Sequence, residues 1–515
     1  MMAEQRQKSP VLLDSLLQGL IVSAVDAVPV AGLNLDSRHI KPGEIFFALR
    51  GRRHDALQFA TAAIDNGAVA IVHQSPANDM LTELARQRGV RLVHDPDLDR
   101  HLGIIAGRFY GEPSRKLKVI GVTGTDGKTS VSHFIAQSFA GVGPASAQRC
   151  GLIGTLGNGF YGALDKATHT TPDAVRVQAL LAGFEARQAG YVAMEASSHA
   201  LDQGRVNGVA FDTAVLTNLG RDHLDYHSDL SAYRAAKQRL FATPELSAGV
   251  VNLHDEFGRA LLSAYGESYP VSVYGFWDDE AGKVTAADRV LAREPVFDSR
   301  GFTANIVVPE GSYDLRCRLL GRFNVLNVLA AIAVLRRFEI PMDEIVAVAS
   351  RLCSVDGRMQ LTHRPGRPAV VVDYAHTPQA LTAALQALRA HCAGRLWCVF
   401  GCGGDRDAGK RPEMGRIAES YADRVVITDD NPRSEDPAAI AVDILAGMRA
   451  PERALLIHDR AEAIEKTIHA AQTEDLVLIA GKGHENTQQI KDELLPFHDQ
   501  TVVNRVLQDS GSFAR

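Results

Sequence analysis

The sequence has few cysteines, no long apolar run and no excess of basic residues. Its six cysteines are spread over 515 residues, too few and too scattered for a disulfide framework or a cysteine-rich zinc site, so a reducing compartment is expected. The most apolar stretches, such as 325–335, fall well short of the ~18 residues that a membrane-spanning helix needs. The N-terminus has no basic region followed by an apolar core, as a secretory signal would have. We therefore expect a cytoplasmic protein without a membrane span.

Charge and composition exclude two further classes of protein. Lys plus Arg number 55 and Asp plus Glu 61, which gives a net charge of −6 without a long basic run, so a nucleic-acid partner is not expected. Apolar residues make up 46% and charged residues 23%, which is too apolar for a disordered chain. At roughly 150 residues per domain the length predicts about three domains. Polar segments at 111–116 and 354–359 indicate the domain boundaries, so the predicted domains are 1–112, 113–354 and 355–515.

The chain repeatedly follows an apolar run with a polar or Gly-rich loop. Residues 45–50 and 68–73 predict two strands around a helix at 55–67. Alternation at 302–308 (FTANIVV) indicates extra strands in the middle of the chain. The pattern predicts an α/β protein whose ligands gather at the carboxyl ends of parallel strands. Further predicted strands are 118–122, 191–194, 213–217, 369–374, 396–400, 424–428 and 476–480.

The segment GVTGTDGKTS at 121–130 follows a strand and opens an amphipathic helix. Its glycines let backbone N–H groups surround phosphate oxygens, Lys128 supplies a charge for the phosphates, and the Thr129 hydroxyl suits Mg²⁺. The usual P-loop has Gly where this chain has Val122. The alternative is a Gly-rich turn without a ligand, but strand, loop, Lys-Thr pair and helix together favour nucleotide binding. The residues predicted to contact ATP are Gly121, Thr123, Gly124, Thr125, Asp126, Gly127, Lys128, Thr129 and Ser130.

Acidic residues and histidines follow two strands next to this loop in the predicted middle domain. Glu195 and His199 follow the strand at 191–194, and a second strand leads into Asp222, His223, Asp225 and His227. Together they suggest a divalent-cation site facing the phosphates. Donor softness would favour Mn²⁺ or Zn²⁺ for a His-rich cluster, whereas Mg²⁺ prefers oxygen. The alternative is that each histidine caps a turn. Lys237, on a predicted helix at 229–241, has the local pattern of a solvent-facing lysine.

Three loops of the C-terminal third, 401–412, 428–437 and 481–485, follow predicted strands. They bring Arg406, Arg433 and Glu485 within possible reach of one another. Two guanidinium groups and a carboxylate suit a zwitterion, because arginine grips carboxylates bidentately and glutamate accepts an ammonium. Solvated surface loops are the alternative for any one of them, but three such loops favour an amino-acid site.

The motifs GVTGTDGKTS, MEASSHAL, NLGRDHLDYH, AYRAAKQRLF, GRFNVLNVLAA, VDYAHTP, GCGGDRDAGKRP, DDNPR and GKGHE occur here in the order found in Mur ligases. The chain resembles this family over nearly its whole length. The resemblance implies three α/β domains, with a central P-loop-type mononucleotide-binding parallel sheet and a C-terminal Rossmann-like domain. It also implies an ATP- and Mg²⁺-dependent amide ligase of cytoplasmic peptidoglycan synthesis. Such an enzyme adds meso-diaminopimelate to the D-Glu γ-carboxylate of UDP-MurNAc-L-Ala-D-Glu through an acyl phosphate.

The resemblance also implies roles for individual residues. Lys237 matches a lysine that is carbamylated in the family, and the catalytic residues would be Lys128, Glu195, His223 and Lys237. The metal ligands would be Thr129, Glu195, His223 and the carbamate. ATP would further contact Asn324, Asn327, Arg358, Asp373 and His376. The UDP-substrate would contact Leu35, Ser37, Arg52, Arg53, His54, His169, Thr170, Thr171, Ser197, Gln203 and Arg205. Diaminopimelate would contact Arg406, Asp430, Asn431, Pro432, Arg433, Gly481 and Glu485.

Two positions depart from the family pattern, and two other functions remain open. Asp126 and His169 stand where relatives often have Asn. The first alternative is another ligase of the superfamily. LDSR at 35–38 and the DDNPR loop argue against a folylpolyglutamate synthase, and the DDNPR loop argues against a lysine-adding ligase. The second is a nucleotide-dependent regulator that ligates nothing. We expect a monomer whose partners are small-molecule substrates.

Overall fold

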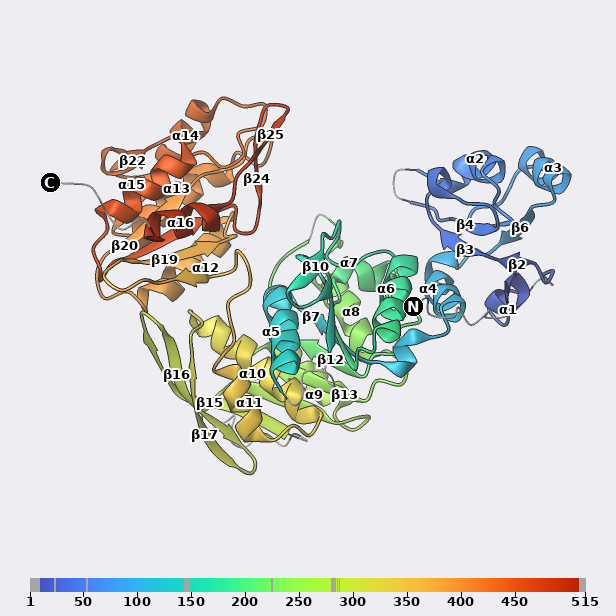
Figure 1. Ribbon diagram of the computed structural model, residues 1–515, viewed down its shortest axis with the longest axis horizontal. Helices are drawn as coiled ribbons and strands as arrows, with labels where there is room; N and C mark the ends of the chain where they lie inside the picture. Colours follow the sequence, from blue (N-terminus) through green and yellow to red (C-terminus); the bar gives the residue numbers. More distant parts are fainter. Residues whose placement is uncertain are drawn as a thin grey trace, which may run out of the picture. The chain divides into compact units, whose positions relative to one another are not determined.

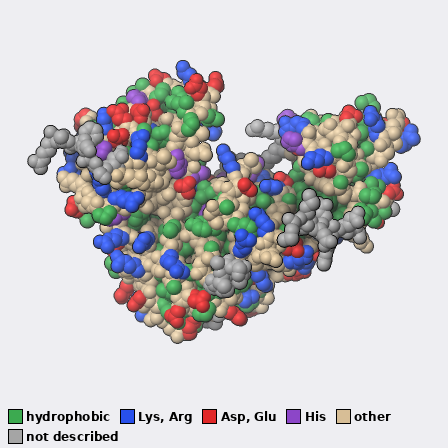
Figure 2. All heavy atoms as spheres, viewed as in Figure 1, with side chains coloured by type: hydrophobic (Ala, Val, Ile, Leu, Met, Phe, Trp, Pro, Cys, Tyr) green, Lys and Arg blue, Asp and Glu red, His purple; other side chains and the backbone are tan. Residues whose placement is uncertain are grey.

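The computed structural model describes residues 10–22, 25–51, 54–142, 149–223, 226–278, 284, 286 and 288–508. The chain divides into two compact units. The first comprises Met1–Lys128, Gly143–Val251 and Asp255–Val271, and the second comprises Thr129–Val142, Asn252–His254 and Ser272–Arg515. Side chains of both charge signs occur over the face drawn in Figure 2, in keeping with the small net charge.

The first unit begins with a four-stranded parallel sheet in the order β3-β4-β5-β6, blue in Figure 1. Its strands alternate with helices, and buried apolar residues form a core on each face. The strands are β3 (Gly32–Asn34), β4 (Glu44–Ala48), β5 (Ala70–His73) and β6 (Arg91–His94), with a separate pair β1 (Val11–Leu12) and β2 (Pro29–Val30). The helices are α1 (Leu13–Leu17), α2 (Ala60–Asp65), α3 (Asp79–Arg88) and α4 (Leu98–Phe109), with short turns η1 (Ser37–His39), η2 (Ala56–Phe59) and η3 (Pro113–Lys116).

The strands that follow in this unit run in the order β10-β9-β8-β11-β7-β12-β13. Five of them, β8, β11, β7, β12 and β13, are parallel, and β9 and β10 add antiparallel strands beside β8. The bounds are β7 (Lys118–Thr123), β8 (Cys150–Gly154), β9 (Gly157–Phe160), β10 (Ala163–Asp165), β11 (Tyr191–Glu195), β12 (Thr213–Leu216) and β13 (Ala248–Asn252). The helices are α6 (Ala174–Ala186), α7 (Ser198–Asp202), α8 (Leu230–Phe241) and α9 (Glu256–Tyr265).

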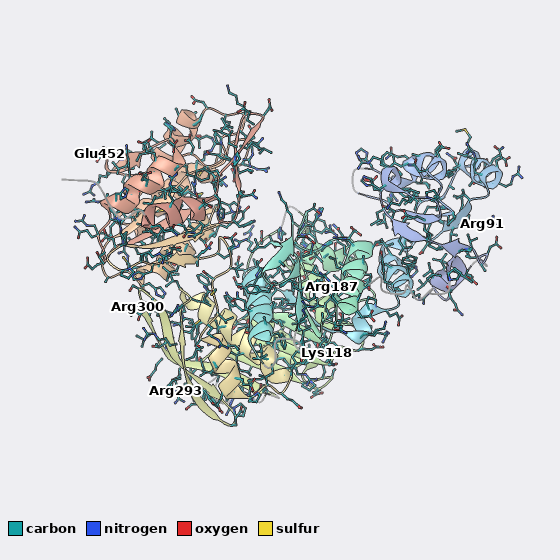
Figure 3. All side chains as sticks on the ribbon, in the orientation of Figure 1. Arg91, Lys118, Arg187, Arg293, Arg300 and Glu452 are labelled. Carbon is teal, nitrogen blue, oxygen red and sulfur yellow. The ribbon has the colours of Figure 1, made fainter. Side chains whose placement is uncertain are left out.

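The central strand β7 sets the position of the predicted nucleotide loop. Its neighbours β11 and β12 are parallel to it, with Glu195 opposite Val122 and Leu216 opposite Thr123. The carboxyl ends of the three strands therefore meet at one edge. At the other end of β7, Lys118 (labelled in Figure 3) pairs with Asp212 at 2.7 Å.

The second unit contains the helix of the nucleotide loop, α5 (Lys128–Gly141), on which Val131, Phe134, Ile135 and Phe139 are all buried as their shared helical face predicts. Three long antiparallel strands, yellow-green in Figure 1, include the residues expected to form extra strands. These three are β15 (Asp288–Asp298), β16 (Gly301–Val308) and β17 (Gly311–Cys317), and β14 (Val271–Phe276) precedes them. The helices that follow are α10 (Arg322–Arg337) and α11 (Met342–Ala349).

The C-terminal part of the second unit is a six-stranded sheet in the order β18-β19-β23-β20-β21-β22. Only β18 is antiparallel to its neighbour. Apolar side chains of α12, α13 and α14 cover one face, and those of α15 and α16 cover the other. The strands are β18 (Gln360–Thr362), β19 (Ala369–Asp373), β20 (Leu396–Phe400), β21 (Arg424–Ile427), β22 (Leu455–Leu456) and β23 (Leu476–Ala480), with a separate hairpin β24 (Thr487–Ile490) and β25 (Glu493–Pro496). The helices are α12 (Pro378–Arg389), α13 (Lys410–Tyr421), α14 (Pro437–Leu445), η5 (Pro451–Arg453), α15 (Arg460–Ala470) and α16 (Asp499–Gln508).

The α/β class and the strands predicted from apolar runs are confirmed, with bounds that differ by a residue or two. All six cysteines are free thiols. In the described part of the chain no helix is both long and apolar enough to cross a membrane. The three domain ranges drawn from composition stay a prediction.

Candidate active site

The loop between β7 and α5 has the shape that phosphate binding requires. Gly124 and Gly127 have φ values of 150° and 82°, which side-chain-bearing residues rarely adopt. A Cβ atom on Gly124 would lie 1.8 Å from the Thr217 hydroxyl oxygen. The close approach of this backbone to the segment after β12 therefore depends on glycine.

The segment after β12 holds the loop through several hydrogen bonds. Thr125 N donates to Asn218 O at 2.9 Å, and Asp126 N donates to Asn218 Oδ1 at 3.0 Å. The Thr217 hydroxyl and the Asn218 amide both donate to Asp126 O, at 2.5 and 3.1 Å. The exposed Asp126 side chain is not needed for these contacts, which use its backbone. Contacts within the protein therefore hold the shape of the loop.

Two lysines share one carbonyl of this loop. Lys128 Nζ donates to Gly124 O at 2.9 Å and to Thr125 O at 2.8 Å. Lys237 Nζ donates to the same Gly124 O at 2.7 Å and lies 4.3 Å from the centroid of the Tyr233 ring. Burial, and next the charge of Lys128, lower the pKa of Lys237 well below its usual value.

The local interpretation of Lys237 as solvent-facing is wrong, because its side chain is 1% exposed. The sequence of α8 alone does not reveal this. Tyr233, Ala236, Leu240 and Phe241 are buried with Lys237, so this lysine lies on the apolar face of its helix. Its spacing from Tyr233 and Phe241 by four residues was the available signal.

Glu195 is fully buried at the end of β11. Its Oε1 accepts from Thr155 N at 2.8 Å, and its Oε2 accepts from the Thr155 hydroxyl at 3.1 Å. A Cβ atom on Gly154 would lie 2.2 Å from Glu195 Oε1, so the carboxylate also depends on a neighbouring glycine. The sequence predicts a role for Glu195 but not for Thr155, whose contact with Glu195 arises when β8 and β11 pair.

Five of the residues predicted to hold the UDP-substrate form one hydrogen-bonded group with Glu195. The Thr171 hydroxyl donates to Glu195 O at 2.7 Å and lies 3.3 Å from the Ser197 hydroxyl. Arg205 Nη1 donates to Thr171 O at 3.0 Å, and its Nε donates to Gln203 Oε1 at 2.9 Å. Burial lowers the pKa of Arg205. Thr170 joins the group through the Thr155 hydroxyl at 3.0 Å.

The other predicted UDP-substrate residues lie elsewhere in the first unit. His169 is exposed, with Nδ1 3.1 Å from the Thr168 hydroxyl. Leu35 is half-buried and Ser37 is buried beside α2, where the Asn66 amide donates to Ser37 O at 2.8 Å. His54 is exposed. Arg52 and Arg53 lie outside the described residues.

His199, which follows β11, and His223 and His227, which follow β12, lie close to one another and to Tyr226, and His223 Nε2 also lies 3.5 Å from Asp222 Oδ2. His199 has its ring centroid 4.7 Å from that of His223 and 4.1 Å from that of Tyr226. The described residues contain no group of three or more His, Cys, Asp or Glu side chains that could hold a metal ion. The cation site facing the phosphates, expected from Glu195, His199, Asp222, His223, Asp225 and His227, stays a prediction, and Asp225 lies outside the described residues.

The predicted adenine contacts Asn324 and Asn327 lie on one face of α10 and are both buried. Asn324 Nδ2 donates to Leu320 O at 2.8 Å, and Asn327 Nδ2 donates to Asn324 Oδ1 at 3.0 Å. Each amide has a further hydrogen-bonding capacity, since Nδ2 carries two donors.

The predicted ATP contacts of the C-terminal part gather at the end of β19. Asp373 accepts from Met359 N at 2.7 Å and from Ala375 N at 2.9 Å, and burial raises its pKa. The Arg358 guanidinium lies 4.7 Å from the centroid of the Tyr374 ring. His376 is exposed, with Nδ1 2.9 Å from Tyr374 O.

The three C-terminal loops meet, because β19, β20, β21 and β23 end at the same edge of their sheet. Arg433 has a left-handed backbone with φ 53°, and its Nη1 donates to Gly404 O at 2.6 Å. A Cβ atom on Gly403 would lie 2.9 Å from Arg433 Nη1 and 3.8 Å from Arg406 Cγ, so the two arginines flank this glycine. The hairpin β24–β25 holds Arg433 through its backbone: Arg433 N donates to Gln489 O at 3.1 Å, and Lys491 N donates to Arg433 O at 2.7 Å.

The acidic side of this group is buried more deeply. Asn431 Nδ2 donates to Glu485 Oε2 at 2.8 Å. Lys482, which the sequence analysis did not single out, has no exposed side-chain surface and donates to both residues. Asp430 Oδ2 would lie 2.6 Å from a Cβ atom on Gly481, so that glycine makes room for the carboxylate. Burial raises the pKa of Asp430. Pro432 is buried in the same loop.

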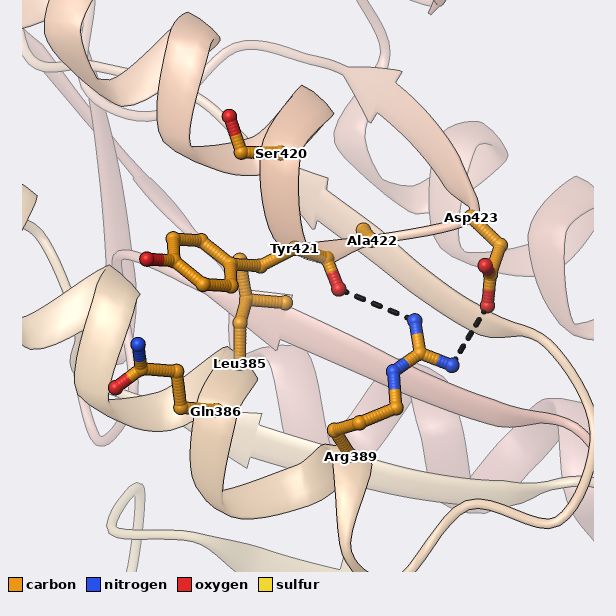
Figure 4. Close-up of a pocket in the computed structure, with 7 residues that line it drawn as sticks. All are labelled: Leu385, Gln386, Arg389, Ser420, Tyr421, Ala422 and Asp423. Atoms are coloured by element: carbon orange, nitrogen blue, oxygen red, sulfur yellow. Dashed lines mark hydrogen bonds and ion pairs between the residues drawn. The ribbon is translucent and has the colours of Figure 1, made fainter.

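A surface pocket between α12 and α13 contains none of these residues (Figure 4). Its one guanidinium, that of Arg389, already donates to Asp423 Oδ2 at 2.8 Å and to Tyr421 O at 3.1 Å. The predicted site residues therefore lie in the strand-end loops and not in this pocket.

Comparison with known proteins identifies the class of protein that these loops define. Models of the "Mur ligase middle domain", the "Mur ligase, glutamate ligase domain" and the "Mur ligase family, catalytic domain" match residues 122–335, 357–483 and 29–110. The chain belongs to the Mur ligase family, as its motifs suggested.

Individual relatives carry a more specific name. A "UDP-N-acetylmuramoyl-L-alanyl-D-glutamate--2,6-diaminopimelate ligase" of Alkalilimnicola ehrlichii is 49% identical over 96% of this chain and 98% of its own length. The protein of the same name from Coxiella burnetii is 45% identical over 93% and 96%. A solved structure of a ligase with that name matches with a TM-score of 0.73 and 36% identity, covering 97% of this chain and 99% of the other.

We predict that Gly124→Ala weakens ATP binding by about 10-fold or more, because the added Cβ would collide with Thr217 and the backbone conformation disfavours alanine. Titration calorimetry with ATP measures the change. Gly183→Ala is the matched control, since nothing lies within 4 Å of its added Cβ in α6. ATP affinity unchanged in Gly124→Ala would contradict the role of this loop.

Proposed function

We propose that the protein is an ATP-dependent ligase that adds meso-diaminopimelate to the D-Glu γ-carboxylate of UDP-MurNAc-L-Ala-D-Glu. The observation that carries this assignment is 45–49% identity, over more than nine-tenths of the chain, to proteins named as diaminopimelate ligases. Mur ligases use ATP, and the reaction makes a precursor of peptidoglycan. The substrates and the family suit a cytoplasmic enzyme that acts as a monomer on small molecules.

In this function the 121–130 loop receives the triphosphate. Lys128, now bonded to loop carbonyls, would turn to the β and γ phosphates, where its charge offsets the charge on the transferring phosphoryl group. The backbone N–H groups of Gly124, Gly127, Thr129 and Ser130 would face phosphate oxygens. Asn324 and Asn327 would contact the adenine, and Arg358, Asp373 and His376 would approach ATP from the third domain.

The γ-carboxylate of the substrate attacks the γ-phosphorus of ATP and releases ADP. The diaminopimelate amine then attacks the acyl phosphate carbonyl, forms the amide, and displaces phosphate while a proton leaves the nitrogen. The protein acts by charge and position, without a protein nucleophile. The connected group Thr170, Thr171, Ser197, Gln203 and Arg205 would hold the muramoyl-dipeptide, while Leu35, Ser37, Arg52, Arg53, His54 and His169 would hold the rest of the UDP-substrate.

Mg²⁺ would be held jointly by protein and phosphate oxygens. The Thr129 hydroxyl and the buried Glu195 carboxylate are oxygen donors of the kind Mg²⁺ takes, and His223 completes the proposed set. Mg²⁺ usually takes one or two carboxylates from protein and completes its coordination with water and substrate phosphates. When bound, the ion would offset negative charge on the phosphates.

Lys237 would join this set as a carbamate. Only a neutral amine has the lone pair that attacks CO₂, and burial beside Lys128 favours the neutral form. Its nitrogen would bond to the carbon of CO₂, one C=O electron pair would move to oxygen, and a proton would pass to water. The product is an anion that suits a cation, whereas an ammonium would repel it.

Arg433 would select diaminopimelate over lysine. The two amino acids share a distal ammonium, but only diaminopimelate has a distal carboxylate, which Arg433 and Arg406 would grip. Asp430, Asn431, Pro432, Gly481 and Glu485 would complete the site. A folylpolyglutamate synthase from Mycobacterium tuberculosis shares the fold at 20% identity, with a TM-score of 0.56 over 73% of this chain. That likeness carries no substrate to this protein, and a lysine-adding enzyme would leave Arg433 unpaired.

We expect purified protein with Mg²⁺ to release ADP only when ATP, UDP-MurNAc-L-Ala-D-Glu and meso-diaminopimelate are all present, because the acyl phosphate forms and is consumed in one site. A coupled ADP assay and mass spectrometry of the tripeptide product measure this. No product with all three reactants would overturn the function and favour a regulator that only binds nucleotide.

We expect Lys237→Met to lower kcat by about 100-fold or more, because the carbamate oxygens are lost. With ¹³C-bicarbonate, NMR of the wild-type protein should show a carbamate signal that Lys237→Met lacks. Lys166→Met, at an exposed lysine of the same unit, should keep both signal and activity. A wild-type protein without the signal would refute the carbamate.

We expect Arg433→Ala to reduce the preference for diaminopimelate over lysine by about 100-fold, since the distal carboxylate loses its partner. The ratio of the two kcat/KM values is the measurement. Arg453→Ala, at an exposed arginine of η5, should leave the ratio as it is in wild type. An unchanged ratio in Arg433→Ala would refute this account of selectivity.

A further inference from the structure

Lys482 is an ammonium buried within the C-terminal site, between residues of two loops. Its side chain is 0% exposed. Lys482 Nζ donates to Asn431 Oδ1 at 2.9 Å and to Glu485 Oε2 at 3.0 Å. Burying a charged group is unfavourable unless it is paired, so this lysine and these acceptors are held as a unit.

Lys482 fixes which way the Asn431 amide faces. The Oδ1 atom accepts from Lys482 Nζ and also from Gln489 N at 2.9 Å. With two donors on the oxygen, the amide nitrogen must face the other way, where Nδ2 donates to Glu485 Oε2 at 2.8 Å. A neutral side chain at 482 would remove one of the two donors that set this orientation.

Lys482 also controls the Glu485 carboxylate. Both bonds to this group end on Oε2, and among the described residues no hydrogen bond ends on Oε1. Burial opposes ionisation, but the charge of Lys482 and the bond from Asn431 hold the pKa of Glu485 below its usual value. The carboxylate therefore stays charged and keeps one oxygen for a further donor.

The loop that carries Lys482 is anchored from beneath by a second buried pair. Arg460 is bonded to Asp499 by Nε and Nη2, at 2.7 and 2.8 Å, and both side chains are fully buried. Arg460 Nη2 also donates to Ala480 O at 3.0 Å, two residues before Lys482. The backbone that presents Lys482 is therefore fixed independently of any ligand.

We propose that Lys482 is a positioning residue, which orients Asn431 and Glu485 so that Glu485 Oε1 receives the distal ammonium of the incoming amino acid. This role rests on the proposed function. Because diaminopimelate and lysine both carry that ammonium, Lys482 supports binding of either one and does not discriminate between them. Discrimination stays with Arg433, and the two halves of the site are separable.

Lys482→Met should raise KM for diaminopimelate by about 10-fold or more while kcat stays within about 3-fold. KM for ATP and for UDP-MurNAc-L-Ala-D-Glu should change by less than about 2-fold, since neither substrate would contact Glu485 in the proposed site. The diaminopimelate-to-lysine ratio of kcat/KM should match wild type, unlike that of Arg433→Ala. Lys482→Arg, which keeps the charge, should recover part of the loss.

Lys466→Met is the matched control, since Lys466 is 62% exposed and pairs with Glu462 on the surface of α15; it should match wild type in every constant. Circular dichroism and thermal unfolding report whether each variant folds, and if Lys482→Met does not, Lys482→Arg decides by the same pattern at smaller amplitude. An unchanged KM for diaminopimelate, or equal losses for all three substrates, would overturn the role of Lys482. Wild-type protein without diaminopimelate-dependent ADP release would overturn the proposed function instead.

Discussion

The sharing of the Gly124 carbonyl by two lysines constrains the whole nucleotide end of the protein. Two ammonium groups on one acceptor repel each other, and Lys237 is also buried. Burial, and next the charge of Lys128, lower the pKa of Lys237, which favours its neutral amine. This arrangement needs a rigid carbonyl, which the bonds from the segment after β12 and the close contact of Gly124 with Thr217 supply.

In the C-terminal site the closely spaced groups are mainly carboxylates, whereas those at the Gly124 carbonyl are ammonium groups. The buried Asp430 and Asp499 and the half-buried Glu485 interact with the buried Arg460 and Lys482, so carboxylates outnumber cations by one in this group. Burial raises the pKa of Asp430, although the charges of Arg460 and Lys482 lower it. An arriving ammonium would offset the negative charge of these carboxylates, while the exposed Arg406 and the half-buried Arg433 would remain available for carboxylates.

Local sequence predicted the strands and the strand-end loops well, because apolar runs followed by Gly-rich turns depend on neighbouring residues alone. It could not predict Thr155 beside Glu195 or Lys482 beneath Glu485, since those contacts arise when distant strands pair. Lys237 shows the limit clearly: a lysine four residues from Tyr233 was interpreted as exposed, but tertiary packing buries it. The family resemblance predicted a role for Lys237, and the fold shows the burial that suits this role.

The two halves of the amino-acid site differ in how they tolerate change. The contacts that hold Arg433 are made with main-chain atoms of Gly404, Gln489 and Lys491, which any residue able to keep the same backbone would provide. The half that contains Glu485 depends on the side chains of Lys482 and Asn431. Substitutions at Gln489 and Lys491 that keep the backbone would therefore preserve the position of Arg433, whereas a substitution at Lys482 or Asn431 would change the contacts of Glu485 itself.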